Sequence, residues 1–376
     1  MRHGVSYLWL VVALSACEST SPSRIDANTG DDAQIMIDAP SGPTRFVAYI
    51  SGGADIAWYD VDKTTGALTT ISSIAAFRTN ANFLAFHGNK LYAVASGNRV
   101  GAYAIDPATA ALTFINDVGS GGTGPAHVAV DKTGKFVLVA NYGSGHIAAM
   151  PVQPGGGLGA GTPILAGGMA HQIETDPTNK FVVVPCLGDN KVAQYLFDAT
   201  SGALTPNAVP ALMTAAGAGP RHITFAPDGK HAYLINELNS TMQALAYDST
   251  TGRLTSVQTM STRASGAMGT NTTAEIVVHP TGKFVYGSNR GDNNIVVLAR
   301  DTTTGMVSLV EHEPTQGMTP RNFTIDPSGK FLYAANQNSN TVVPFAIDTT
   351  TGRLSPAATP ISVPTPQFVG ILTLPR

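Results

Sequence analysis

The sequence predicts an all-β fold, a seven-bladed β-propeller of four-stranded antiparallel blades. A turn followed by an apolar residue, as in Thr251-Gly252-Arg253-Leu254, recurs seven times and ends at residues 68, 112, 158, 204, 254, 307 and 354. The average step is about 48 residues, and a period of roughly 40–50 residues with short strands and glycine turns is typical of propeller blades. No long helical apolar period follows residue 43.

A second turn phrase predicts the strands inside each repeat. It ends in lysine and reads Pro227-Asp228-Gly229-Lys230 in one copy and Pro327-Ser328-Gly329-Lys330 in another. Apolar runs flank it, for example at 223–225 and 232–235, which is the signature of a hairpin. A third apolar run, the Thr-Gly turn and a fourth run complete four strands per repeat.

The two ends of the chain are predicted to share one blade. Residues 365–371 have the phase of a first strand such as 320–324, whereas residues 46–51 have the phase of a second strand such as 331–336. Pairing these ends would close the ring and remove its open edges. We therefore expect one domain over residues 44–376.

Composition restricts the partners. Only 12% of residues are charged, the formal net charge is −3, and no run of Lys and Arg occurs, so we expect no nucleic-acid partner. No metal-ligand spacing is present, and we expect neither a metal nor a cofactor. We expect a monomer.

The N-terminus predicts export. Residues 1–17 combine a basic start, an apolar stretch and Leu14-Ser15-Ala16-Cys17, which resembles the lipobox of bacterial lipoprotein signal peptides. We expect a lipid on Cys17 to anchor the protein to a membrane on the periplasmic or cell-surface side, with residues 18–43 as a flexible linker. The alternative is an ordinary secretory signal cut near Ala16.

The candidate site lies where the repeats differ. The start of each first strand and the end of each second strand lie at the same end of a hairpin, so in a propeller they surround one mouth of the central channel. The candidates at these positions are His127, Asn141, His171, Arg221, His222, Glu237, Glu275, Arg290 and Arg321. Crowding of acids, imidazoles and guanidiniums is typical of binding and catalytic sites, and the arginines favour an anionic ligand. For each residue alone a structural role is the alternative, such as turn chemistry for the asparagines.

The stretches Gly217-Ala218-Gly219-Pro220-Arg221-His222 and Asn236-Glu237-Leu238-Asn239-Ser240 resemble the lactonase family of seven-bladed propellers. This family includes bacterial propeller-type 6-phosphogluconolactonases and fungal carboxymuconate lactonising enzymes, and the resemblance covers roughly residues 45–376. It implies His171, Arg221, Glu237 and Arg290 as catalytic residues. It also implies His127 and Arg321 as substrate contacts, to which the position at the mouth adds His222, Asn141 and Glu275.

The predicted function is hydrolysis of a small anionic or sugar-like lactone. Glu237 or His171 would activate water while the other protonates the leaving alkoxide, and Arg221 would stabilise the oxyanion or hold an anionic group. Two alternatives stay open. One is an exported propeller that binds a ligand without catalysis, and the other is a lactonising cycloisomerase.

Overall fold

The computed structural model describes Met1 and residues 42–376. The expected signal peptide, the lipidation site Cys17 and nearly all of the expected linker therefore lie outside the described residues. The first strand begins at Thr44.

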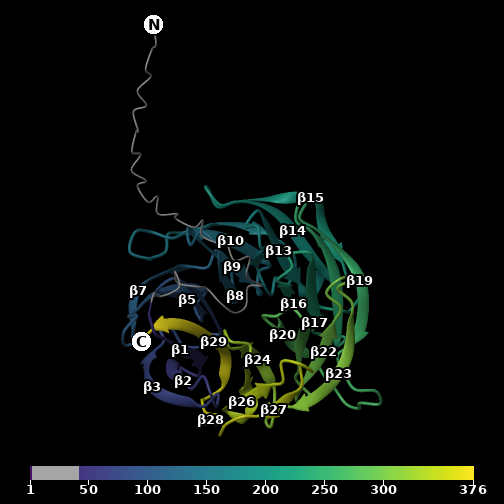
Figure 1. The fold of residues 1–376 in the computed structure, drawn as a ribbon. Helices are drawn as coiled ribbons and strands as arrows, with labels where there is room; N and C mark the ends of the chain where they lie inside the picture. Colours follow the sequence, from purple (N-terminus) through teal and green to yellow (C-terminus); the bar gives the residue numbers. More distant parts are fainter. Residues whose placement is uncertain (2–41) are drawn as a thin grey trace.

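Within residues 42–376 the strands form seven antiparallel sheets around a central channel (Figure 1). This confirms the predicted seven-bladed propeller. The first three blades in chain order are β29 (Pro366–Pro375), β1 (Thr44–Gly52), β2 (Asp55–Val61) and β3 (Leu68–Ala75); β4 (Phe83–His87), β5 (Lys90–Ala95), β6 (Arg99–Ile105) and β7 (Leu112–Gly119); and β8 (Pro125–Val130), β9 (Phe136–Asn141), β10 (His146–Pro151) and β11 (Thr162–Leu165).

Four more blades complete the ring. They are β12 (Glu174–Thr175), β13 (Phe181–Cys186), β14 (Lys191–Asp198) and β15 (Ala203–Met213); β16 (Pro220–Phe225), β17 (His231–Asn236), β18 (Thr241–Asp248) and β19 (Arg253–Ser261); β20 (Thr273–Val278), β21 (Phe284–Asn289), β22 (Asn294–Arg300) and β23 (Val307–Pro314); and β24 (Pro320–Ile325), β25 (Phe331–Asn336), β26 (Thr341–Ile347), β27 (Leu354–Pro356) and β28 (Ile361–Ser362). The first strands, including β8, β16, β20, β24 and β29, surround the channel (Figure 1).

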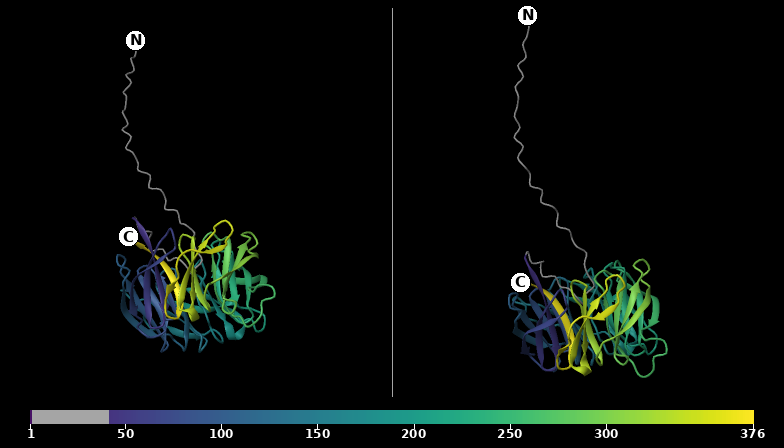
Figure 2. Two further views of the ribbon diagram at one scale, coloured as in Figure 1. Left: turned by 90° about the horizontal axis from the view of Figure 1, so that it is seen from below. Right: turned by 60° about the horizontal axis from the view of Figure 1, so that its bottom comes forward.

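The last strand closes the ring. β29 pairs antiparallel with β1 from Thr44↔Pro375 to Gly52↔Pro366, and the purple and yellow strands lie side by side in both views of Figure 2. Both ends of the domain therefore belong to one blade, as predicted. This pairing joins the two ends of the chain within one sheet and so holds the ring closed.

The recurring Thr-Gly turn joins neighbouring blades. The hydroxyls of Tyr233, Tyr286 and Tyr333 donate to backbone carbonyls of this turn in the next blade, at 2.7, 2.8 and 3.0 Å. Gly352 has a left-handed φ of 77°, and a Cβ added there would lie 2.4 Å from the Phe284 ring. The Thr-Gly turn therefore recurs because it needs a left-handed conformation and because it packs against the neighbouring blade.

The seventh and fourth blades depart clearly from the regular pattern. In the seventh blade the outer strand is divided into β27 and β28, which both pair with β26, and it contains Pro356 and Pro360, which lack the N–H that a ladder requires. In the fourth blade the inner strand β12 has two residues and is preceded by an isolated bridge between Ala170 and Cys186. His171 therefore lies in an irregular segment and not on a strand.

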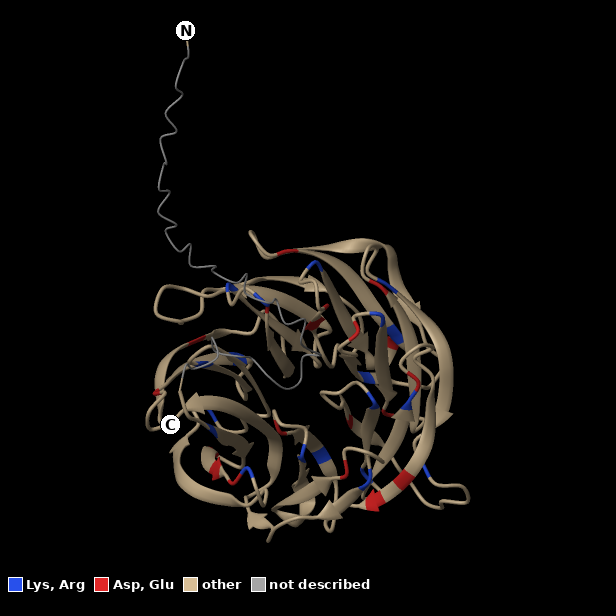
Figure 3. Cartoon of the chain, viewed as in Figure 1, with Lys and Arg blue, Asp and Glu red and all other residues tan. Residues whose placement is uncertain are grey.

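Charged residues are sparse over the described chain, and several of them lie on the strands nearest the channel (Figure 3). No helix in residues 42–376 has the length and apolar character needed to cross a membrane.

Candidate active site

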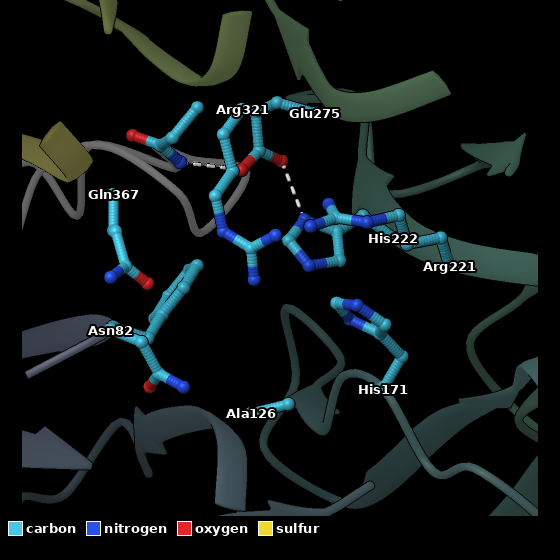
Figure 4. A pocket seen from close by; sticks show the side chains of 10 residues that line it. Asn82, Ala126, His171, Arg221, His222, Glu275, Arg321 and Gln367 are labelled. Carbon is cyan, nitrogen blue, oxygen red and sulfur yellow. Dashed lines mark hydrogen bonds and ion pairs between the residues drawn. The ribbon is translucent and has the colours of Figure 1, made fainter. Parts of the chain in front are cut away.

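A small cavity that is partly open to solvent lies where the first strands begin (Figure 4). Ten described residues line it: Asn82, Phe83, Ala126, His171, Arg221, His222, Glu275, Arg321, Asn322 and Gln367. They come from all seven blades. Residues that are up to 285 positions apart in the sequence therefore meet at one mouth of the channel.

β-bulges point side chains into this cavity. Register shifts leave Ala126, Arg221, Arg321 and Gln367 as the extra residue near the start of β8, β16, β24 and β29. An extra residue in one strand of a ladder turns its side chain away from the regular alternation. All four bulged residues line the cavity, and each directly follows a proline, so the same local device serves four blades.

Five predicted site residues line the cavity: His171, Arg221, His222, Glu275 and Arg321. Glu237 and Arg290 lie beside it, since the carboxylate of Glu237 joins two guanidiniums. Its Oε2 lies 3.0 Å from Nε of Arg221 and its Oε1 lies 3.0 Å from Nη2 of Arg290. Arg221 and Glu237 are thus on the same side of the ring, and Glu237 compensates the charge of two arginines.

Backbone carbonyls of the sixth blade also hold the guanidiniums of Arg221 and Arg290 in place. Arg221 Nη1 donates to the carbonyl of Ala274 at 2.5 Å, and Arg290 Nη2 donates to that of Thr273 at 2.8 Å. Burial and the charge of Arg290 hold the pKa of Arg221 below its ordinary value, whereas Glu237 opposes this shift. Arg221 is therefore rigidly held, with its side chain 3% exposed.

Glu275 is the second carboxyl group and is almost completely buried, with 1% exposed. Its Oε1 lies 2.8 Å from Nδ1 of His222 and accepts the backbone N–H of Ile276 at 3.0 Å, and its Oε2 accepts the side-chain amide of Asn322 at 2.6 Å. Burial raises the pKa of Glu275 to about 7, although the charge of Arg221 and the hydrogen bonds lower it. This carboxyl group can therefore change charge near neutral pH.

Three imidazoles pack at the site. The ring centroid of His222 lies 5.1 Å from that of His171 and 5.7 Å from that of His127. Burial and the neighbouring arginines lower the pKa of His171 and His222 well below the ordinary value, and for His127 the charges of His222 and Arg221 add to burial. For all three rings these shifts favour the neutral imidazole.

Arg321 differs from the other two arginines. The described residues provide no hydrogen-bond or ion-pair partner for its guanidinium, which lies in the middle of the cavity (Figure 4). Burial and Arg290 lower its pKa. A partly buried cation without a paired carboxylate is a suitable partner for an anionic group of a ligand.

His127 and Asn141 are placed at the margin. His127 is buried behind the cavity against Phe83, with ring centroids 4.2 Å apart. The side chain of Asn141 makes loop hydrogen bonds, accepting from Ser120 Oγ at 2.6 Å and donating to two backbone carbonyls. Neither residue is among those that line the cavity in the described chain.

Sequence reasoning missed Phe83, Ala126 and Gln367 as cavity residues. A signal for Gln367 existed, because residues 365–371 have the same phase as the strand that contains Arg321. The bulged residue after the strand-initial proline is then Gln367 in the first blade and Ala126 in the third. Phe83 carried no signal, since an apolar residue at a strand start also fits a core position.

No group of three or more His, Cys, Asp or Glu side chains with metal-binding geometry occurs among residues 42–376. The side chains at the cavity include imidazoles, guanidiniums and a carboxyl group whose pKa burial raises to about 7. Such a set can move protons and stabilise negative charge.

Comparison with known proteins agrees with this fold. The chain is 33% identical to the 6-phosphogluconolactonase of Bacillus subtilis over 350 residues, which cover 88% of this chain and 99% of that protein. Among solved structures it resembles a periplasmic gluconolactonase from Pseudomonas aeruginosa, with a TM-score of 0.81, 26% identity and coverage of 88% and 99% of the two chains.

It also resembles a putative 6-phosphogluconolactonase from Bacteroides uniformis, with a TM-score of 0.81, 29% identity and coverage of 87% and 99%. The profile described as "Lactonase, 7-bladed beta-propeller" matches residues 44–371, the span of the closed ring. The chain therefore belongs to the seven-bladed β-propeller lactonase family.

Proposed function

We propose that this protein hydrolyses a sugar-type lactone in the cavity at the channel mouth. The observation that carries the proposal is the meeting of an unpaired guanidinium, Arg321, with neutral imidazoles in one small cavity. Ester hydrolysis requires a group that takes a proton from water and a cation that stabilises the oxyanion. The B. subtilis relative and the P. aeruginosa neighbour, whose names describe lactonases acting on gluconate-type lactones, support the substrate class.

The residues divide into two layers. Arg321 and Arg221 line the cavity, and we assign them to the lactone carbonyl oxygen and to the carboxylate that hydrolysis creates. Glu237 and Arg290 lie beside it, and we assign them to the positioning of Arg221. Two groups were predicted for proton transfer, His171 and Glu237. His171 lines the cavity and Glu237 does not, so of these two we place His171 next to the reacting ester.

We propose an unphosphorylated aldonic lactone as the substrate. Residues 1–17 have the pattern of an export signal, and phosphorylated sugars are metabolites of the cell interior. A neutral lactone still needs the arginines, because negative charge develops at its carbonyl oxygen and remains on the product. Blocked processing and loss from the membrane fraction in a Cys17→Ala variant would test the lipid anchor.

A lactone panel tests the function. The purified protein is incubated with glucono-1,5-lactone, 6-phosphogluconolactone and a plain alkyl lactone, and acid release is followed against heat-inactivated protein, since sugar lactones also open spontaneously. Turnover of the first substrate above the others supports the proposal. Binding of the lactone without turnover would favour the non-catalytic binding propeller, and formation of a lactone from an open acid would favour the cycloisomerase.

A further inference from the structure

We propose that His222 is the general base of this cavity and that Glu275 is its positioning residue. The inference rests on the lactone hydrolysis proposed above and assigns the proton acceptor of that reaction. The resemblance to the family implied Glu237 or His171 for this role. The contacts of the described residues favour the buried pair on β16 and β20 instead.

Hydrogen-bond donors around Glu275 define its orientation and that of His222. The backbone N–H of Val369 can only donate, and it donates to Asn322 Oδ1 at 2.9 Å. The amide NH₂ of Asn322 must then face Glu275, which accepts it at 2.6 Å. The backbone N–H of Ile276 donates to the other oxygen. While Glu275 is ionised, both of its oxygens can only accept, so the hydrogen of the His222 contact lies on Nδ1.

This tautomer leaves Nε2 of His222 with a free lone pair. Nε2 is buried and has no hydrogen-bond partner among the described residues, while His222 itself lines the cavity. Figure 4 shows the imidazole between Glu275 and the interior of the cavity, near His171. A buried acceptor without a partner is costly, and a water or substrate hydroxyl in the cavity would satisfy it.

Packing holds the ring in this orientation. Its centroid lies 5.8 Å from that of Phe83, edge to face, in addition to the contacts with His171 and His127. Glu237 has no such freedom, because its two oxygens are held by Arg221 and Arg290. Of the two carboxylates, Glu275 is therefore the one that orients an imidazole whose other nitrogen is free at the cavity.

The reaction balances as a hydrolysis. Water gives one proton to Nε2 of His222 as its oxygen bonds to the lactone carbonyl carbon, and the developing oxyanion lies against Arg321. The ring C–O bond then breaks, and the alkoxide takes the proton back from the imidazolium, directly or through His171. Glu275 stabilises the imidazolium while it exists, so the products are the hydroxy acid and the unchanged pair.

The pair predicts an acid limb in the pH profile. His222 and Glu275 face the charged groups Arg221, Glu237, Arg290 and Arg321 and the neutral rings of His127 and His171. Burial raises the pKa of Glu275 to about 7. If His222 binds the added proton, its Nε2 carries a hydrogen. If Glu275 binds the proton, the carboxylic acid donates to Nδ1, and the hydrogen of the neutral ring lies on Nε2. In both cases Nε2 can no longer accept a proton from water. Activity is thus present above the pKa of the pair and is lost below it.

The test compares wild type, His222→Gln, Glu275→Gln, the double variant and His279→Gln. His279 is a matched control, since it is a buried imidazole just beyond the other end of β20, where it bonds to the Gly329 carbonyl. We expect kcat/KM to fall by roughly 10²–10⁴-fold in His222→Gln, the usual value of a general base. The double variant should be no worse than His222→Gln, because the two residues act as a unit. His279→Gln should retain wild-type activity.

The pH profile separates catalysis from mere structure. Wild-type kcat/KM should fall tenfold per pH unit below an apparent pKa near 7, and in Glu275→Gln this limb should move to lower pH, because an amide cannot share the proton and burial lowers the pKa of the remaining imidazole. If wild type is active and His222→Gln keeps the wild-type rate, the assignment of His222 as general base is overturned, whereas the proposed lactone hydrolysis stands. If His222→Gln does not fold, an unchanged acid limb in Glu275→Gln would overturn it equally. An inactive wild type would instead reject the proposed function.

Discussion

Glu237 is the carboxylate that compensates Arg221 and Arg290, and its removal should destabilise the domain. The side chains of Arg221, Arg290 and Glu237 are 3%, 13% and 19% exposed. Removing one partner of a buried ion pair costs about 3–5 kcal/mol, and the exposure of Glu237 reduces this to about 2–3 kcal/mol for Glu237→Gln. Unfolding entropy of about 2.1 cal/mol/K per residue gives roughly 0.7 kcal/mol/K for residues 44–376, so Tm should fall by about 3–4 °C.

Calorimetry of wild type, Glu237→Gln and Glu313→Gln measures this effect. Glu313 lies on the outer strand β23 and has no ion-pair partner among the described residues, so its variant should melt within about 1 °C of wild type. Added sulfate should raise the Tm of Glu237→Gln more than that of wild type, because an anion can then pair with the released guanidiniums. Equal melting of Glu237→Gln and wild type, with equal responses to sulfate, would refute the account of Glu237 as their counter-ion.

Three further changes test the site and the ring. Arg321→Gln should lower kcat by roughly 10²–10³-fold in a lactone assay, as loss of one oxyanion donor does elsewhere, with Tm retained or raised; an unchanged rate would remove Arg321 from the mechanism. Gly352→Ala should lower Tm by more than Gly229→Ala, because both positions have left-handed φ but only the Cβ at 352 would collide with Phe284, whereas 229 is open; equal losses would show that φ strain alone matters. Deleting residues 366–376 should abolish cooperative unfolding, since it removes β29 from the first blade; a sharp transition in calorimetry would contradict this.

The ring could be predicted from the chain because its causes are local. Thr-Gly turns such as that at Gly352 need a left-handed φ, and each must recur once per blade to meet its neighbour. Closure was predictable for the same reason, because the last strand continues the phase of the earlier first strands. The divided outer strand of the seventh blade and the short β12 depend on where individual ladder bonds fail, and the period carries no such information.

The position of the site was also predictable, whereas its partnerships were not. Antiparallel hairpins place strand starts and ends at one mouth, so His171, Arg221 and Arg321 were expected together. Which residue faces the cavity depends on bulges, and a shift of one residue moves a side chain to the other face. For this reason Asn141 makes loop contacts, whereas Gln367 reaches the cavity.

By itself the sequence determined the number of blades, the closing strand and the end of the ring where unlike residues gather, since turn conformation and period act over a few residues at a time. Only the tertiary structure decided that Glu237 is bound by two arginines while Glu275 holds His222. Glu275 and His222 are 53 positions apart in the chain, and their contact depends on how adjacent blades are rotated and bulged. A hydrogen bond needs its atoms within about 3 Å, a precision that no repeat length specifies.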